Sequence, residues 1–159
     1  MQIILLSDSH GRTDRLEKLF HEAEKLQIKH IIHAGDFAVY DVEKIFAAHP
    51  KINFYIAKGN CDVNPEVLEK IQKLPNCILS EIVNLELEGI KFSVSHIEGF
   101  PKSKLKKNTD IFCHGHTHRT KIEEHEGFKV LNPGALCEDS GFFIISLPKV
   151  KIKRFKIKF

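Results

Sequence analysis

The sequence contains no tryptophan, a single methionine and no Cys-x-x-Cys pair among its four cysteines. Structural zinc sites usually draw their cysteines from such pairs, so we expect no structural zinc. No apolar run approaches the ~20 residues that a membrane span needs. The opening stretch MQIILLSDSH lacks the basic segment and cleavage site of a secretory signal. We therefore expect a cytoplasmic protein without membrane contact, whose cysteines are small apolar residues rather than disulfide partners.

The remaining composition is typical of a folded globular chain. Of its 159 residues, 42% are hydrophobic and 28% are charged, which is enough apolar material for a core. This length predicts a single domain spanning residues 1–159. The net charge of +3 is too small to indicate nucleic acid as a partner.

The first half of the chain alternates between two kinds of apolar pattern. Short continuous apolar runs predict buried strands at residues 2–6, 30–33 and 52–57. Apolar residues at helical spacing predict helices at residues 13–26, 41–48 and 65–74. Thr13 or Asp14 is expected near the N-cap of the first helix, and Pro65 and Pro75 bracket the third. This order is typical of parallel strands covered by helices.

The second half changes to hairpin patterns. Hairpins are predicted over 82–95, turning at Glu88-Gly89, and over 119–132, turning at Glu126-Gly127. Further strands are predicted at residues 110–113, 141–146 and 150–159, and a short helix at 102–107. Hairpins favour antiparallel or mixed pairing, so we expect an α/β fold with two packed sheets flanked by helices.

The C-terminal segment KVKIKRFKIKF alternates, but its phase slips at Lys153-Arg154. A β-bulge at this point would keep all the apolar side chains on one buried face. The lysines are interpreted as the solvated face of an edge strand, where lysine discourages unwanted pairing. Nucleic-acid binding by these lysines is the alternative.

Seven side chains able to bind metal stand in five short pieces, each at the end of an apolar run or beside a glycine. The pieces are Asp8-Ser9-His10, Gly35-Asp36, Gly59-Asn60, His96 and Gly115-His116-Thr117-His118. Imidazole with carboxylate suits Mn²⁺, Fe²⁺, Ni²⁺, Co²⁺ or Zn²⁺. Two divalent ions would bring four positive charges, of which Asp8 and Asp36 cancel two; the remainder suits one hydroxide and one phosphate diester anion. The pieces together predict a two-metal site that hydrolyses phosphate esters.

Each piece taken alone has an ordinary structural explanation. Asp8 or Asp36 could serve a helix cap or a turn, Asn60 a turn, and His96 could be a hydrogen-bonded core histidine. Their common position where parallel strands end, which is where α/β folds place ligands, argues against all of these explanations holding together. No metal role is assigned to the other histidines: His21, His49 and His125 are expected on the surface, His30 and His33 flank a strand, and His114 adjoins the Gly115–His118 tract.

The five pieces, in this order, resemble the motifs of the calcineurin-like metallophosphoesterase superfamily. The form Gly59-Asn60-Cys61-Asp62 is similar to that of the small archaeal and bacterial phosphodiesterases of the YfcE/MJ0936 type. The resemblance implies a four-layer α/β/β/α sandwich of two mixed β-sheets flanked by helices, with two divalent metals at its rim. It implies one metal bound by Asp8, His10, Asp36 and His118, and another bound by Asp36, Asn60, His96 and His116, with Asp36 bridging. A hydroxide held between the metals, Mn²⁺ foremost, would attack phosphorus, so that Asp36, Asn60 and His96 serve catalysis through the metals.

The sequence departs from the broader superfamily at two positions. Many members carry, directly after the asparagine, a histidine that protonates the leaving oxygen, whereas this chain has Cys61, a poor general acid. His96 is followed by Ile97, where glycine is frequent. We therefore expect a small phosphodiester substrate with a good leaving group, and a homodimer or tetramer by resemblance. The alternatives are a non-catalytic Vps29-like protein-binding scaffold, or a nuclease or phosphomonoesterase of the same family.

Overall fold

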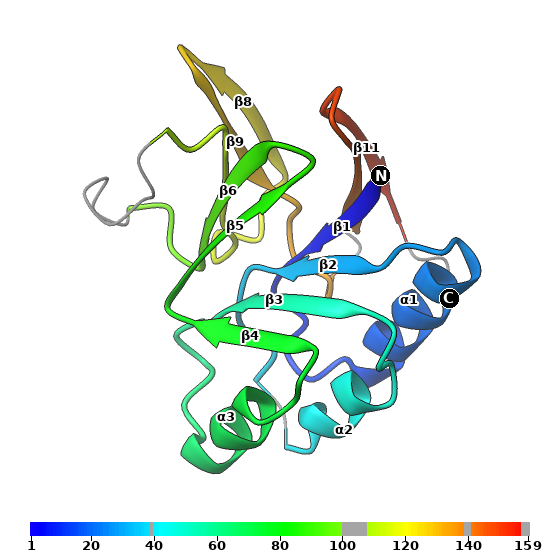
Figure 1. Cartoon of the computed structure of the whole chain (residues 1–159). Helices are drawn as coiled ribbons and strands as arrows, with labels where there is room; N and C mark the ends of the chain where they lie inside the picture. Colours follow the sequence, from blue (N-terminus) through cyan, green and yellow to red (C-terminus); the bar gives the residue numbers. More distant parts are fainter. Residues whose placement is uncertain (39, 100–107, 139–140, 157–159) are drawn as a thin grey trace.

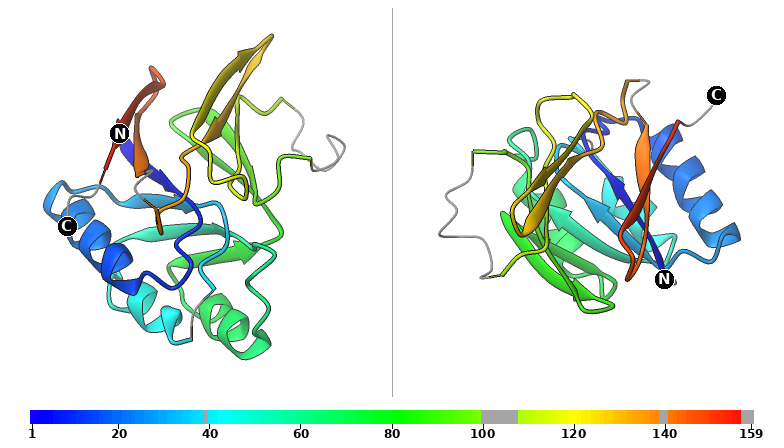
Figure 2. Two further views of the ribbon diagram at one scale, coloured as in Figure 1. Left: turned by 180° about the vertical axis from the view of Figure 1, so that it is seen from behind. Right: turned by 90° about the horizontal axis from the view of Figure 1, so that it is seen from above.

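The computed structural model describes residues 1–38, 40–99, 108–138 and 141–156, which form two β-sheets and three helices (Figure 1). The helices are α1 (Thr13–Lys25), α2 (Val42–Ala47) and α3 (Pro65–Gln72). All three lie on one side of the first sheet, and the second sheet lies on its other side (Figures 1 and 2). The expected α/β class with two mixed sheets is confirmed. The short helix expected at 102–107 falls outside the described residues.

The first sheet has six strands in the order β11-β10-β1-β2-β3-β4. Strands β1 (Gln2–Leu6), β2 (His30–His33), β3 (Asn53–Ala57) and β4 (Cys77–Ser80) run parallel, as the alternation of strands and helices predicts. Strands β10 (Phe142–Ser146) and β11 (Lys151–Phe155) add antiparallel pairs. Strand β4 was not predicted, because its sequence CILS is short and only Cys77 in it is buried.

The second sheet has five strands in the order β5-β6-β7-β9-β8. The strands are β5 (Ile82–Leu87), β6 (Ile90–Ser95), β7 (Ile111–Cys113), β8 (Lys121–His125) and β9 (Phe128–Asn132). The two predicted hairpins, β5–β6 and β8–β9, are confirmed. Strand β7 runs parallel to both β6 and β9, so this sheet is mixed as well.

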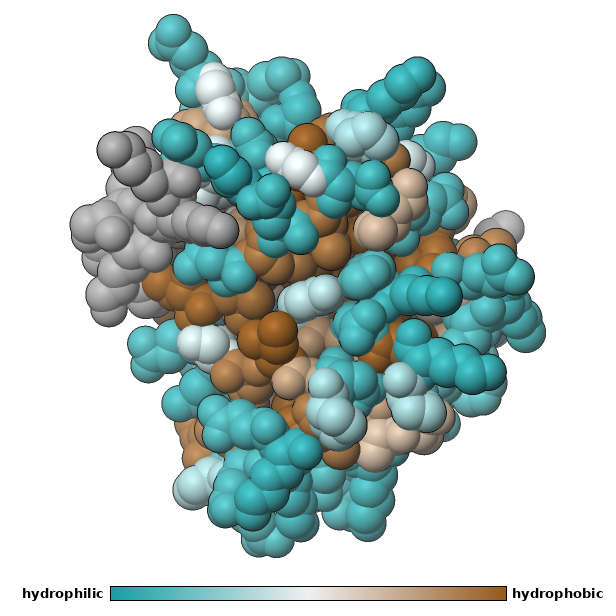
Figure 3. All heavy atoms as spheres, viewed as in Figure 1, coloured by the Kyte–Doolittle hydropathy of each residue, from teal (hydrophilic) through white to brown (hydrophobic). Residues whose placement is uncertain are grey.

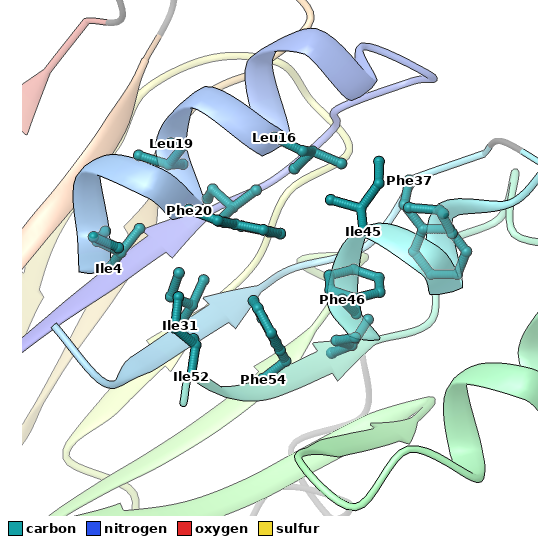
Figure 4. Packing of buried hydrophobic residues seen from close by; sticks show 14 of the residues in the cluster. Ile4, Leu16, Leu19, Phe20, Ile31, Phe37, Ile45, Phe46, Ile52 and Phe54 are labelled. Carbon is teal, nitrogen blue, oxygen red and sulfur yellow. The ribbon is translucent and has the colours of Figure 1, made fainter. Parts of the chain in front are cut away.

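The core consists of two apolar layers that share the first sheet. Along β1, Ile4 and Leu6 face the helices whereas Ile3 and Leu5 face the second sheet. This is why β1 reads as a continuous apolar run rather than an alternating one. Under the helices, the ring of Phe54 lies 4.8 Å from that of Phe20 on α1 and 4.9 Å from that of Phe46 on α2, centroid to centroid (Figure 4). Hydrophilic side chains cover the outer surfaces of α2 and α3, at the bottom of Figure 3.

The prediction of a β-bulge at Lys153-Arg154 is wrong. Strand β11 pairs with β10 in unbroken register over residues 151–155, on the edge of the sheet as expected. Ile152 packs on the layer between the sheets, and the ring of Phe155 stacks on Phe142 of the helix-side layer. Because both faces of this sheet are covered, the apolar side chains of the edge strand can change face without a bulge.

One further expectation is confirmed and one is corrected. Helix α1 has Arg12 as its N-cap, so Thr13 and Asp14 lie next to the N-cap as expected, and the Arg12 side chain pairs with Asp14 at 2.7 Å. His49 is 3% exposed and not on the surface, because it packs edge-on against Phe20 and lies 3.1 Å from the carboxylate of Glu24. His21 and His125 are exposed as expected.

Candidate metal centre

The five predicted pieces meet where strands of both sheets end. Asp8 and His10 follow β1, Asp36 follows β2 and Asn60 follows β3, while His96 follows β6 and the Gly115–His118 tract follows β7. Backbone hydrogen bonds tie these loops together: the N–H of Asp8 donates to Gly35 O at 2.9 Å, and that of His10 to Asp36 O at 3.0 Å. The N–H of Gly115 donates to His96 O at 3.0 Å. The carboxyl ends of parallel strands thus bring the pieces to one rim.

Five of the seven predicted ligands have a backbone in the left-handed region. The φ angles are 52° for Asp8, 39° for His10, 58° for Asp36, 67° for His116 and 56° for His118. This conformation is uncommon for residues other than glycine and costs about 1–3 kcal/mol where it is held. The packing around these loops must therefore hold the five residues in this conformation.

Asp8, His10 and His118 form the first group of metal-capable side chains. Asp8 Oδ1 lies 3.3 Å from His118 Nε2 and 3.7 Å from His10 Nε2. The two Nε2 atoms are themselves 3.2 Å apart. Among the described residues, the buried Asp8 Oδ1 has no hydrogen-bond partner. A divalent cation would satisfy a buried carboxylate oxygen that faces two ring nitrogens in this way.

Asp36, His96 and His116 form the second group. His96 Nδ1 donates to Ala34 O at 2.8 Å, which leaves Nε2 as the atom free to bind metal. That Nε2 is buried, lies 3.1 Å from Asp36 Oδ2 and makes no hydrogen bond with any described residue. The His116 ring packs edge-on against His96, with centroids 5.1 Å apart. The backbone N–H of His116 donates to Asp8 Oδ2 at 3.1 Å.

Asp36 lies between the two groups. Its Oδ2 is 3.1 Å from His96 Nε2 and 3.8 Å from His10 Nε2, and its Oδ1 accepts the Cys61 N–H at 2.8 Å. Burial by itself would raise the pKa of Asp36, but the His96 imidazole and the Cys61 N–H outweigh it and hold the pKa well below its usual range. Asp36 is therefore an anion at neutral pH, as a metal ligand must be.

Asp62 holds the loops after β2 and β3 in register. Its Oδ2 accepts the N–H groups of Asp36 at 2.9 Å and Gly59 at 2.8 Å, and its Oδ1 accepts that of Ala38 at 2.8 Å. This carboxylate therefore fixes the backbone of Asp36. Asn60 is the predicted ligand with the least support, since its side-chain amide contacts Cys61 Sγ at 3.4 Å while the residue lines an open recess together with His96.

Two features of the centre were missed from the sequence. Glu138, after β9, accepts a hydrogen bond from His118 Nδ1 at 2.8 Å and so directs His118 Nε2 toward Asp8. His33 is fully buried and lies beneath the loops, with its Nε2 3.1 Å from Ser9 Oγ and its Nδ1 accepting the Gly35 N–H at 3.1 Å. Burial, with a smaller effect of His96, lowers the pKa of His33 to about 3, so this ring is neutral and structural. No sequence signal distinguishes either residue.

Comparison with known proteins identifies the superfamily. Residues 1–146 match the model of the calcineurin-like phosphoesterase superfamily domain. The chain belongs to this superfamily. The phosphodiesterase MJ0936 of Methanocaldococcus jannaschii is 28% identical over 144 residues, which cover 86% of this chain and 85% of that protein.

Solved structures of other proteins have the same fold. An archaeal phosphodiesterase superposes with a TM-score of 0.82 at 24% identity, covering 99% of this chain and 100% of that chain. Vps29 of Entamoeba histolytica in complex with Zn²⁺ superposes with a TM-score of 0.63 at 16% identity, covering 98% of this chain and 99% of that chain. Identities this low show that the folds are alike and nothing more. Among the described helices, none has the length and apolarity needed to cross a bilayer.

The residues of this chain fit the divalent metals that its superfamily implies. Two buried atoms have no hydrogen-bond partner among the described residues: Asp8 Oδ1, which faces the ring nitrogens of the first group, and His96 Nε2, which faces the Asp36 carboxylate in the second. Both groups combine imidazole with carboxylate, the ligand set of Mn²⁺, Fe²⁺, Ni²⁺, Co²⁺ and Zn²⁺.

Removing the Glu138 carboxylate should weaken metal binding, because His118 would lose the partner that orients its ring. We expect Glu138→Ala to lower metal affinity about 10–100-fold, and Glu138→Gln, which can still accept the hydrogen bond, to recover most of it. Isothermal titration of the chelator-stripped variants with Mn²⁺ measures this. If Glu138→Ala bound Mn²⁺ as tightly as the unmodified protein does, the contact of Glu138 with His118 would have no orienting role.

Proposed function

We propose that this chain is a metal-dependent phosphodiesterase that binds two divalent ions and hydrolyses small phosphate diesters. The observation that carries the proposal is the position of Asp36, whose Oδ2 faces His10 of one group and His96 of the other. One carboxylate between two imidazole groups is the arrangement that a pair of ions ~3.5–4 Å apart needs.

Each group is proposed to hold one ion. The first ion would be held by Asp8, His10, Asp36 and His118, and the second by Asp36, Asn60, His96 and His116. Two bound divalent ions would lower the pKa of a water molecule toward ~7 and offset the charge of the phosphate. The protein would orient them: Glu138 directs His118, the Ala34 carbonyl directs His96, and the Cys61 N–H fixes the Asp36 carboxylate. Mn²⁺ is the first choice of metal, with Ni²⁺, Fe²⁺, Co²⁺ and Zn²⁺ as alternatives.

A metal-by-substrate matrix tests the proposal. Protein stripped with chelator should be inactive, and Mn²⁺ should restore hydrolysis of bis(4-nitrophenyl) phosphate to a greater extent than hydrolysis of 4-nitrophenyl phosphate, its monoester. The release of 4-nitrophenol is the measurement. Hydrolysis that survives complete metal removal would contradict the proposal, and the absence of hydrolysis with every metal would favour the Vps29-like scaffold.

The leaving group should limit the rate, because no strong general acid follows Asn60. Cys61 occupies that position, and partial burial together with the nearby Asp36 carboxylate raises the pKa of its thiol, which makes it a weaker proton donor. We expect rates on aryl diesters to fall steeply as the leaving phenol becomes less acidic. Cys61→His should raise the rate on poor leaving groups about tenfold or more. Hydrolysis rates that do not change with the acidity of the leaving phenol would show that another group protonates the leaving oxygen. A Cys61→His variant that hydrolyses poor leaving groups no faster would show the same.

A further inference from the structure

An apolar hollow opens beside the metal centre, on the side of Cys61. It holds about 130 Å³ and is lined by the loop after β2, the loop that carries Cys61, and the first turns of α3. Cys61 belongs to both features, since its N–H binds Asp36 Oδ1 at 2.8 Å and its Sγ lies within 4.8 Å of ligand atoms of His10 and Asp36. The hollow and the proposed metal centre therefore adjoin each other at Cys61.

Two polar side chains of the hollow, Asp62 and Asn64, already accept backbone hydrogen bonds. Asp62 accepts three backbone N–H groups with its two oxygens. Asn64 is the N-cap of α3, and its Oδ1 accepts the N–H groups of Glu66 at 3.0 Å and Val67 at 3.4 Å. These oxygens thus already hold the loops and the start of α3. The hollow thus offers an apolar surface.

Two exposed apolar side chains stand at this hollow. Tyr40 is 79% exposed and Val63 is 74% exposed, whereas Phe37 and Val67, which also line it, are buried. A ligand that covered Tyr40 and Val63 would remove apolar surface from water, at about 25 cal/mol per Å². The volume suits one ring, since a cavity of roughly 150 Å³ is enough to bind benzene.

A second recess, on the other side of the Cys61 loop, has charged side chains of both signs in its lining. It is lined by Lys58, Asn60 and Glu81, with Val63 common to both sides. A phosphate diester held at the metal centre carries two substituents that leave phosphorus in different directions. One would meet the apolar hollow, and the other would meet a recess with charged side chains.

We propose that the apolar hollow binds a planar ring of one ester substituent, so that the substrates are phosphodiesters carrying an aromatic or heteroaromatic group. This inference rests on the proposed function, because the phosphate must be held by the metals. The ring would lie against Tyr40 and Val63 while the phosphate lies at the metal centre, with Cys61 beside both.

The test compares two small anions that differ only in the ring. Phenylphosphonate and methylphosphonate are each titrated into the Mn²⁺-loaded protein, and isothermal titration calorimetry measures the two dissociation constants. We expect phenylphosphonate to bind about tenfold tighter. Tyr40→Ala/Val63→Ala should reduce this ratio to about twofold. The matched control Leu26→Ala/Ile78→Ala removes two apolar side chains that are 58% and 54% exposed and do not line the hollow, and it should keep the full ratio.

Equal affinity for the two phosphonates, or a ratio unchanged in Tyr40→Ala/Val63→Ala, would overturn the ring site. A parallel assay with bis(4-nitrophenyl) phosphate separates this failure from failure of the proposed function. If that diester is hydrolysed but the ring gives no advantage, only the ring site is wrong. If no metal supports hydrolysis while the ring still tightens binding, the proposed function is wrong and the ring site stands.

Discussion

Asp36→Asn should lower hydrolysis of bis(4-nitrophenyl) phosphate by at least about a thousandfold, or ~4 kcal/mol of transition-state stabilisation. The amide has the shape of the carboxylate but not its charge, and Asp36 Oδ2 faces imidazoles of both groups. An amide is a weak bridge between two cations, so at least one ion should be lost as well. Steady-state kinetics and the metal content of the purified variant measure both effects.

The control for this variant is Asp14→Asn, which removes the same charge from a carboxylate that is 56% exposed and paired with Arg12 on α1. It should keep full activity and full metal content. An Asp36→Asn protein that retained both would contradict the central role of Asp36.

Gly59→Ala should lower hydrolysis by about a hundredfold or more, although Gly59 touches no substrate. A Cβ at this position would overlap the Asp36 carboxylate oxygen Oδ1 and backbone nitrogen, and would lie 2.8 Å from Asp36 Cγ. Asp36 must therefore move, and a displacement of ~1 Å at a catalytic centre can cost 10²-fold in rate. Overpacking of this kind should also destabilise the fold by about 1–3 kcal/mol. Kinetics well below the melting temperature, with thermal unfolding in parallel, separate the two effects.

Gly99→Ala is the matched control, because a Cβ on Gly99 meets no atom of the described residues within 4 Å. It should leave activity and melting temperature within error of the unmodified protein. If Gly59→Ala remained folded and fully active, the close packing of Gly59 on Asp36 would have no part in holding the centre.

Most of the fold and the candidate ligands could be predicted because their signals are local. The continuous apolar runs of β1 to β3 and the alternation of β5 and β6 follow from which faces of a strand are buried. The candidate ligands stand directly after such runs, so their place at one rim followed from parallel pairing. Strand β4 was missed because only one of its four residues is buried, which is too few to give a recognisable apolar pattern. The prediction of a bulge in β11 was wrong because the pattern cannot show that Ile152 packs between the sheets while Phe155 stacks on Phe142 of the helix-side layer.

The order of residues along the chain places metal-capable side chains at the ends of strands. Which of these side chains touch one another depends on how distant segments pack. His10 and His118 are 108 positions apart in the chain, yet their Nε2 atoms lie 3.2 Å apart. The contact of Glu138 with His118, the three N–H groups bound by Asp62 and the burial of His49 likewise depend on loops packed from distant segments. Periodicity records only whether a residue faces the interior, whereas the partner it meets there is set by how the two sheets and the helices pack.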